Sequence, residues 1–159
     1  MKANYIIIPL ITIITAGVGS WITSAGMDWY HKIKLPAFTP SGSFIGMVWT
    51  IIFILAAISA LLVWNSRMVL PGSFYMLKEG VMTLFILNAV LNVVWSLLFF
   101  NMHFIAAAAW EAGLLGLSVV ALFILIWPIS RLAAWLLAPY AAWVAFATYL
   151  TYTVWALNR

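Results

Sequence analysis

Long apolar segments alternate with short polar ones along the whole of this chain. The seven Lys and Arg residues and the three Asp and Glu residues fall at positions 2, 28, 32, 34, 67, 78, 79, 111, 131 and 159. The gaps between these groups of charges are long enough for helices to cross about 30 Å of hydrocarbon at about 1.5 Å per residue. The pattern predicts an all-α integral membrane protein, a single domain over residues 1–159, with helices at about residues 5–26, 44–66, 80–100, 105–127 and 132–158.

Composition excludes a soluble globular domain. The 159 residues are 67% hydrophobic and 6% charged, whereas about a quarter of the residues in a soluble protein are charged. The chain has no cysteine, which excludes disulfides, thiolate metal sites and cysteine nucleophiles. The net charge of +4 is spread over several loops. We therefore expect the partners to be the lipid bilayer and small molecules, and not nucleic acid.

The first apolar run has two interpretations, a cleaved signal peptide or a retained membrane span. It carries no charge from Ala3 to Met27. A signal peptide has an apolar core of about 7–15 residues. The greater length favours a retained span.

A polar interruption, WYHKIKLPAFTPS at residues 29–41, separates the first two predicted helices. Pro36 and Pro40 each lack an amide proton and disfavour a helical conformation in the preceding residue. We expect a folded-back loop over residues 27–43 that covers the end of the bundle. Lys32 and Lys34 give this loop two positive charges.

Two polar features lie inside the predicted helices. Asn88 and Asn92 are one helical turn apart, so both face the bundle, where they serve either interhelical hydrogen bonding or ligand contact. Glu111 lies about seven residues from the start of its helix. We expect Glu111 to reach the membrane interface, and the alternative is a functional carboxylate within the membrane.

Periodic side chains mark faces of three further helices. Trp49 and Phe53 share one face of the second helix. In the fourth, small residues favour close packing within the bundle or with a second copy. In the fifth, a stripe from Tyr140 to Val154 either packs against neighbouring helices or forms the wall of a binding site. Pro139 lies inside this predicted helix and is expected to bend it. The small residues are Ala108, Ala109, Ala112, Gly113 and Gly116.

Five segments in order carry a resemblance to a known family. They are the loop WYHKIKLPAFTPS, MVWTIIF, LNVVWSLLFF, AAWEAG and PYAAWVAFATYLTYTVWALN. The chain resembles the TspO/MBR family of translocator proteins over essentially its full length. The resemblance implies a five-helix bundle with a cavity beneath the first loop, formation of a homodimer, and a place in a bacterial cell membrane. It also implies binding of porphyrins, haem and related hydrophobic ligands, and in some bacterial members light-dependent breakdown of protoporphyrin.

The resemblance also implies roles for individual residues. Tyr30 would belong to the lid of the cavity, and Tyr30 and Trp143 match the aromatic residues linked to porphyrin degradation. The chain departs from the family at Thr83 and Leu87, which replace the small residues of a glycine motif tied to dimerisation. The sequence pattern proposed for sterol contact is also absent, because the spacing between its aromatic and basic positions is one residue too long in this chain. The residues expected to line the cavity by resemblance are Trp49, Asn88, Asn92, Tyr140, Trp143 and Ala147.

The residues themselves suit a tetrapyrrole, which is a flat, largely apolar disc with two carboxylates on one edge. Indole and phenol rings offer faces for the disc, and cations at the water boundary suit its edge. Trp95, Phe53 and Leu150 complete the predicted ligand-binding set, with Lys32 and Lys34 facing the propionates. For haem, His31 lies near the expected mouth and His103 is expected in the opposite turn.

The sequence contains no metal-binding cluster and no cofactor motif. We therefore expect no required cofactor, with protoporphyrin or haem as the ligand. The main hypothesis is a receptor or carrier in tetrapyrrole homeostasis or stress response. The alternatives are a light- and oxygen-dependent enzyme that degrades protoporphyrin at the same site, and an exporter of small molecules.

Overall fold

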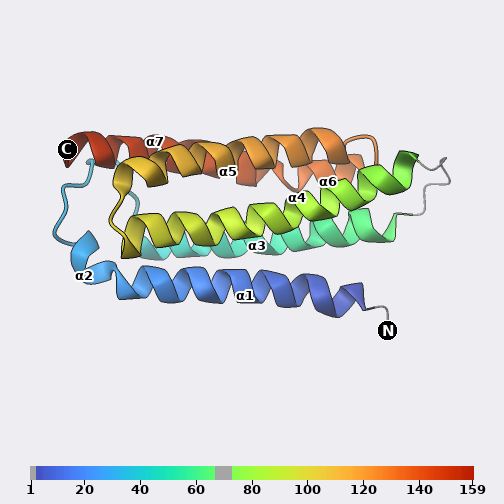
Figure 1. Cartoon of the computed structure of the whole chain (residues 1–159), viewed down its shortest axis with the longest axis horizontal. Coiled ribbons are helices and arrows are strands. Elements are labelled where there is room, and N and C mark those ends of the chain that lie inside the picture. Colours follow the sequence, from blue (N-terminus) through green and yellow to red (C-terminus); the bar gives the residue numbers. More distant parts are fainter. Residues whose placement is uncertain (1–2, 67–72) are drawn as a thin grey trace.

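A computed structural model describes residues 3–66 and 73–159 of the chain (Figure 1). These residues form helices and connecting segments without a β-strand. Five of the helices are long and apolar enough to cross a membrane, which confirms the predicted fold class. The predicted turn at Pro71 and Gly72 lies outside the described residues. The long helices are α1 (Asn4–Ala25), α3 (Gly42–Asn65), α4 (Ser73–Ser96), α5 (Ile105–Ile126) and α7 (Ala138–Leu157).

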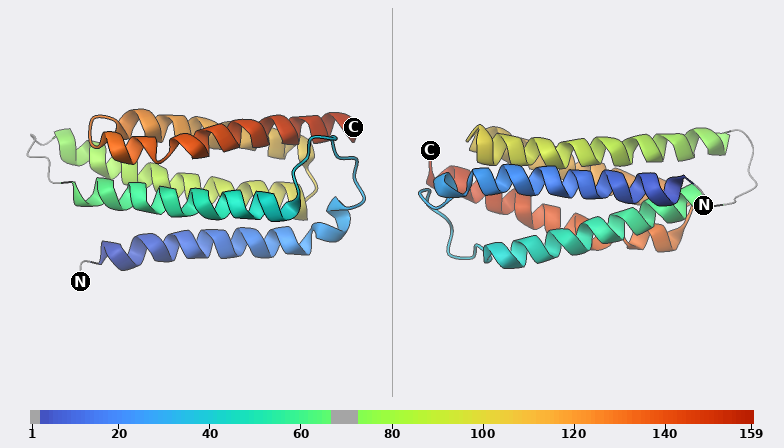
Figure 2. Two further views of the ribbon diagram at one scale, coloured as in Figure 1. Left: turned by 180° about the vertical axis from the view of Figure 1, so that it is seen from behind. Right: turned by 90° about the horizontal axis from the view of Figure 1, so that it is seen from below.

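The helices run up and down in one bundle (Figures 1 and 2). α1 packs against α3 and α4, and α5 packs against α4 and α7. The short helix α2 (Met27–Tyr30), the turn after α4 and the carboxyl terminus share one end of the bundle, which we call the α2 end. α3 also packs on the short helix α6 (Arg131–Trp135) near the other end.

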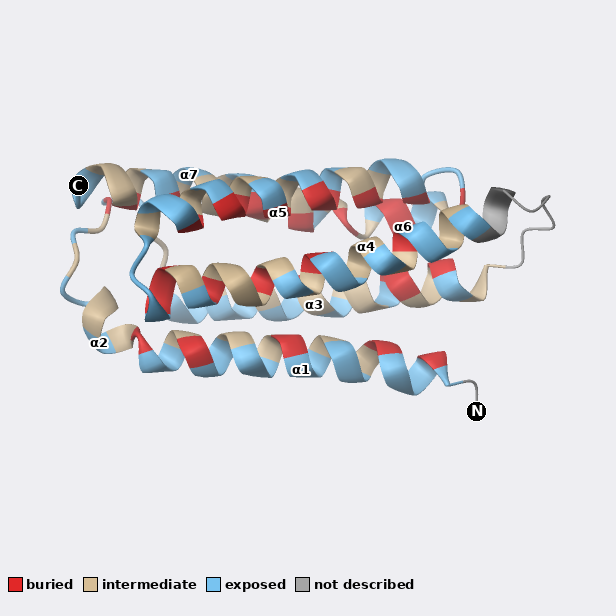
Figure 3. Ribbon diagram, viewed as in Figure 1, coloured by how far each residue is buried: buried red, intermediate tan, exposed pale blue. Residues whose placement is uncertain are grey.

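Burial follows the interior of the bundle (Figure 3). Buried apolar side chains form two clusters, one centred on α5, α6 and α7, and one at the α2 end around Phe99 and Phe100. The outer faces carry large apolar residues such as Ile13, Trp110 and Leu117, with 67%, 82% and 66% of their surface exposed. Exposed residues of this kind on spanning helices are the surface that lipid covers.

The region between the first two spans is less irregular than expected. α2 follows Gly26 directly, and α3 begins at Gly42 after Ser41, whose hydroxyl accepts a hydrogen bond from the Phe44 amide at 3.3 Å. Between α1 and α3, only Gly26 and residues 31–41 lack helical structure. They cross to α7, where the Lys34 amide donates to Asn158 Oδ1 at 2.9 Å.

The fifth span consists of two helices, α6 and α7, and not of one bent helix. Pro139 lies in the first turn of α7, where a helix has no internal acceptor for the missing amide proton. The break frees the carbonyl of Ala133, which accepts a hydrogen bond from the hydroxyl of Ser59 on α3 at 2.8 Å. A neighbouring helix therefore repairs the backbone bonding at the break.

Three of the small residues of α5, Ala108, Ala112 and Gly116, pack inside the bundle, whereas an added Cβ atom at Gly113 would meet no heavy atom within 4 Å. Ala108 and Ala112 are buried. A Cβ atom added to Gly116 would lie 3.4 Å from Val144 Cγ1 of α7. Close packing of α5 on α7 therefore accounts for Gly116 within a single chain.

Candidate ligand-binding cavity

A cavity of about 820 Å³ lies inside the bundle toward the α2 end. Side chains of α1, α3, α4, α5 and α7 line it, together with residues of α2 and of the π-helix η1 (Leu97–Asn101). Its size falls within the range of about 300–1,000 Å³ that is usual for small-molecule sites. No Lys, Arg, Asp or Glu occurs among the lining residues in the described parts of the chain.

The structure brings eight of the predicted site residues together around this cavity. They come from four separate segments of the chain, so the bundle is needed to assemble them. The eight are Tyr30, Trp49, Phe53, Asn92, Trp95, Trp143, Ala147 and Leu150.

Aromatic rings form much of the wall. Trp49 of α3 lies 5.5 Å from Phe53, between ring centroids. Trp95 of α4 stacks on Phe99 of η1 at 5.3 Å with an interplanar angle of 12°. Trp143 of α7 lies 5.4 Å from Phe146. These rings are placed on three different helices, so the cavity has flat apolar surfaces on several sides.

Asn88 and Tyr140, which we expected in the wall, lie behind it. Tyr140 Oη donates to Asn88 Oδ1 at 2.9 Å, and Asn88 Nδ2 donates to Ser118 Oγ of α5 at 2.8 Å. Asn92 Nδ2 donates to Tyr140 Oη as well. Burial of these polar groups requires hydrogen bonds, and they find them in one another. The network joins α4, α5 and α7 and fixes Asn92, the one member that also lines the cavity.

Tyr30 enters the wall because α2 turns the chain across the α2 end. Its ring lies 5.6 Å from that of Phe100 and 6.1 Å from that of Phe99. Burial raises the pKa of the Tyr30 phenol above its ordinary value, so the group stays neutral at physiological pH.

The loop lysines and both histidines lie outside the lining. Lys32 and Lys34 are exposed, on the segment that crosses to α7. We expected His103 at the opposite end of the bundle from the first loop. It lies instead at the same end, where its ring stacks on Trp29 of α2 with 4.2 Å between ring centroids. His31 is exposed beside Tyr30. The described residues of the wall therefore offer no imidazole as an axial ligand to haem iron, and the described chain holds no group of three or more metal-binding side chains.

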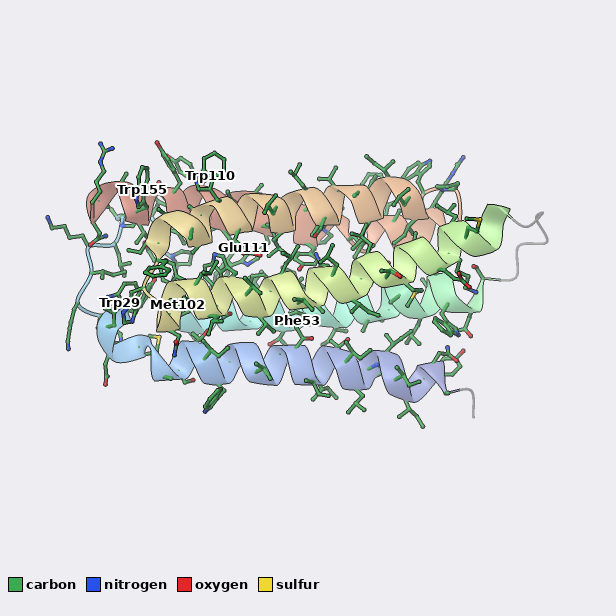
Figure 4. The ribbon with its side chains drawn as sticks, viewed as in Figure 1. Trp29, Phe53, Met102, Trp110, Glu111 and Trp155 are labelled. Atoms are coloured by element: carbon green, nitrogen blue, oxygen red, sulfur yellow. The ribbon has the colours of Figure 1, made fainter. Side chains whose placement is uncertain are left out.

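We expected Glu111 to reach the membrane interface, but this prediction is wrong. Glu111 lies on the buried side of α5 with Ala108, Ala112 and Leu115. Figure 4 shows it on the side facing α4, whereas Trp110 points outward. Glu111 is 6% exposed, and neither carboxylate oxygen has a hydrogen-bond partner within the described parts of the chain. An isolated carboxylate is costly in this environment.

Sequence reasoning missed the contribution of α1 to the wall. Thr12, Thr15, Ala16, Gly19 and Thr23 all line the cavity. These small and hydroxyl-bearing residues recur at helical spacing, which is the signal that identifies their common face. The Thr12 and Thr15 hydroxyls donate to carbonyls of their own helix, at 3.0 and 2.9 Å, so their oxygens retain acceptor capacity toward the cavity.

A five-helix membrane bundle with an aromatic-walled cavity between its helices is the class of protein that these features define. Residues 6–156 match the model of the TspO/MBR family. The chain is 32% identical over 158 residues to the "Tryptophan-rich protein TspO" of Bacillus cereus, covering 99% of either chain. It is 32% identical over 148 residues to "Protein CrtK" of Rhodobacter capsulatus, covering 90% of this chain and 86% of the relative.

A more distant match is the human "Translocator protein", which is 30% identical over 143 residues, covering 89% of this chain and 82% of the relative. The chain belongs to the TspO/MBR family, as its motifs indicated. It is a multi-pass protein of the bacterial cell membrane.

Proposed function

We propose that this protein binds porphyrins, haem and related hydrophobic ligands in its cavity, as a receptor or carrier in tetrapyrrole homeostasis or stress response. The observation that carries the proposal is the set of Trp49, Trp95 and Trp143 around one cavity. Their indole faces suit a flat aromatic disc, and the uncharged wall suits its apolar body. The absence of an imidazole among the described lining residues favours recognition of the ring over recognition of a metal at its centre.

Titration with protoporphyrin tests this proposal through the quenching of tryptophan fluorescence. Trp143→Ala removes one ring from the wall, and we expect the affinity to fall about tenfold or more, because stacking contributes about 1–3 kcal/mol. Trp110→Ala is the matched control, because Trp110 is 82% exposed on the outer face of α5. Equal affinities for wild type and Trp143→Ala would contradict binding in this cavity.

A second candidate is light-dependent degradation of the bound porphyrin with dioxygen as the oxidant. The observation in its favour is that Tyr30 and Trp143, which are far apart in the sequence, both line the same cavity. Both side chains are able to donate an electron to an excited pigment held between them. The wall has no other group of the kind used in hydrolysis or metal-assisted catalysis among the described residues.

Illumination of purified protein with protoporphyrin in air, followed by product analysis, separates degradation from binding alone. We expect Tyr30→Phe and Trp143→Phe to slow loss of the porphyrin spectrum while each keeps an aromatic ring in the wall. An unchanged spectrum with the wild-type protein would reject the enzymatic function and leave the binding function intact.

Assembly into a homodimer stays a prediction from the resemblance, and cross-linking in membranes tests it.

A further inference from the structure

We propose that hydrophobic ligands enter the cavity sideways from the lipid, through a gap between α1 and α3. This inference rests on the proposed ligand-binding function, and it adds that the ligand comes from the lipid bilayer and not from water. We call the gap the α1–α3 opening. It is defined by the exposed residues of the cavity lining, which are Ile13, Ser20 and Ser24 on α1 and Gly42, Gly46, Thr50 and Ile54 on α3.

The exposure of the lining is strongly one-sided. Every exposed lining residue belongs to α1 or α3. The lining residues of α4, η1, α5 and α7 are buried or half-buried, as are those of α2. The cavity therefore communicates with the surroundings of the bundle along α1 and α3, and the other helices close it.

Aromatic contacts close the neighbouring gap between α3 and α7. Phe44 of α3 lies 6.2 Å from Trp143 of α7, between ring centroids. Phe38, in the segment that crosses to α7, lies 6.3 Å from Phe146 and stacks on Tyr149 at 5.6 Å. Three ring contacts thus cover this side, whereas the α1–α3 opening is bordered largely by glycine, serine and threonine.

The two helices that border the opening are joined at its far end. Asn4 Nδ2 of α1 donates to Asn65 Oδ1 of α3 at 3.3 Å. In the right-hand view of Figure 2, α3 turns away from α1 toward the α2 end. The opening therefore lies in the half of the bundle that contains the cavity.

Nothing within the described chain fills the opening at its glycines. A Cβ atom added to Gly42 or to Gly46 would meet no heavy atom within 4 Å. Ile13 and Ile54, 67% and 54% exposed, lie near the middle of their spanning helices, so the opening extends to the depth of the hydrocarbon. A route at this depth suits a ligand dissolved in lipid, because its apolar body would pass from hydrocarbon to the uncharged wall beside Trp49.

Reversible closure of the opening by a cross-link tests the route. The chain has no cysteine, so Ser20→Cys with Gly46→Cys introduces the only two thiols, which a short dimaleimide joins across the opening. We expect cross-linking before addition of protoporphyrin to slow association about tenfold or more, and cross-linking after loading to slow release to a similar extent. Asn4→Cys with Asn65→Cys, cross-linked at the end that is already joined, should change neither rate.

A porphyrin-independent measurement keeps the two proposals separate. Ala147→Cys places a thiol in the cavity wall, and its labelling by a lipid-soluble maleimide reports entry directly. We expect Gly46→Phe to slow this labelling about tenfold, and Gly113→Phe, at an equally open glycine outside the lining, to leave it unchanged.

Two results distinguish failure of the route from failure of the function. Slow labelling with Gly46→Phe in a protein that does not bind protoporphyrin would reject the proposed function and retain the route. Normal protoporphyrin binding, with labelling and binding rates insensitive to both Gly46→Phe and the cross-link, would overturn the α1–α3 opening.

Discussion

Because the described wall of the cavity carries no charged side chain, ligand affinity must come from ring faces and from a few hydroxyl and amide groups. The carboxylates of a tetrapyrrole would then lie toward the water boundary, where Lys32 and Lys34 are exposed at the α2 end. Exposed ion pairs contribute about 0.2–1 kcal/mol each, much less than the burial of an aromatic disc. The lysines should therefore adjust affinity without determining it.

A comparison of protoporphyrin with its dimethyl ester tests the role of the lysines. We expect the double variant Lys32→Ala and Lys34→Ala to weaken binding of the acid about two- to tenfold, because two exposed ion pairs are lost. Binding of the ester, which has no carboxylate, should not change. A similar loss for both ligands, measured by fluorescence titration, would show that the lysines act on the protein and not on the propionates.

Glu111 should reduce the stability of the bundle. Both of its oxygens are buried without a partner in the described chain, so folding requires either a desolvated charge or uptake of a proton. We expect Glu111→Gln to stabilise the protein by about 1–3 kcal/mol in thermal unfolding in detergent. Glu79→Gln is the control, because Glu79 is exposed near the start of α4, and it should have little effect. A destabilised Glu111→Gln variant would instead indicate a partner that the carboxylate needs.

At the scale of elements, the junction of α1 and α2 depends on a single glycine. A Cβ atom added to Gly26 would lie 2.7 Å from Phe100 Cβ and closer still to the Phe100 carbonyl oxygen. Phe100 belongs to the π-helix η1 and to the buried cluster at the α2 end. Gly26 has a negative φ of −93°, which residues other than glycine also adopt, so the requirement for glycine is steric.

Gly26→Ala is therefore expected to destabilise the protein by about 1–3 kcal/mol through overpacking. Gly17→Ala on the same helix is the matched control, because an added Cβ there meets no heavy atom within 4 Å. It should be neutral or slightly stabilising, since alanine favours helix over glycine. Equal melting temperatures for the two variants would contradict the close contact between Gly26 and Phe100.

Spacing of charges and prolines predicted the five spans because membrane helices must satisfy their backbone hydrogen bonds internally over a fixed thickness. Details at the helix ends depend on contacts between segments and could not be predicted in this way. η1 forms where Phe99 and Phe100 pack against α1 and α2. The break between α6 and α7 depends on Ser59, which comes from another helix.

At the scale of the whole molecule, resemblance and ring chemistry identified eight residues of the cavity wall from the sequence, among them its three tryptophans. Two predicted residues lie outside the wall because of hydrogen bonds between helices, which the pattern of a single helix does not reveal. Asn88 and Tyr140 share a helical face with true lining residues, yet their hydrogen bonds to each other and to Ser118 hold them behind the wall. The contribution of α1 was missed because small hydroxyl residues are equally common in helix packing.

Binding inside the bundle should stabilise all five spans together, because α1, α3, α4, α5 and α7 each contribute to one cavity. A ligand at 100 times its dissociation constant stabilises a folded protein by about 2.7 kcal/mol. We therefore expect protoporphyrin to raise the melting temperature of the wild-type protein. Trp110→Ala, on the outer face of α5, should show the same increase.

Trp143→Ala separates stabilisation through the cavity from stabilisation by porphyrin adsorbed on the apolar exterior. With affinity lowered tenfold, the same ligand concentration supplies only about 1.4 kcal/mol, so the increase in melting temperature should be roughly halved. Porphyrin that adsorbs to the lipid-facing surface would instead raise the melting temperature of wild type and Trp143→Ala equally. Because Trp110 lies on that surface and Trp143 in the wall, the pair of variants locates the bound ligand without a further structure.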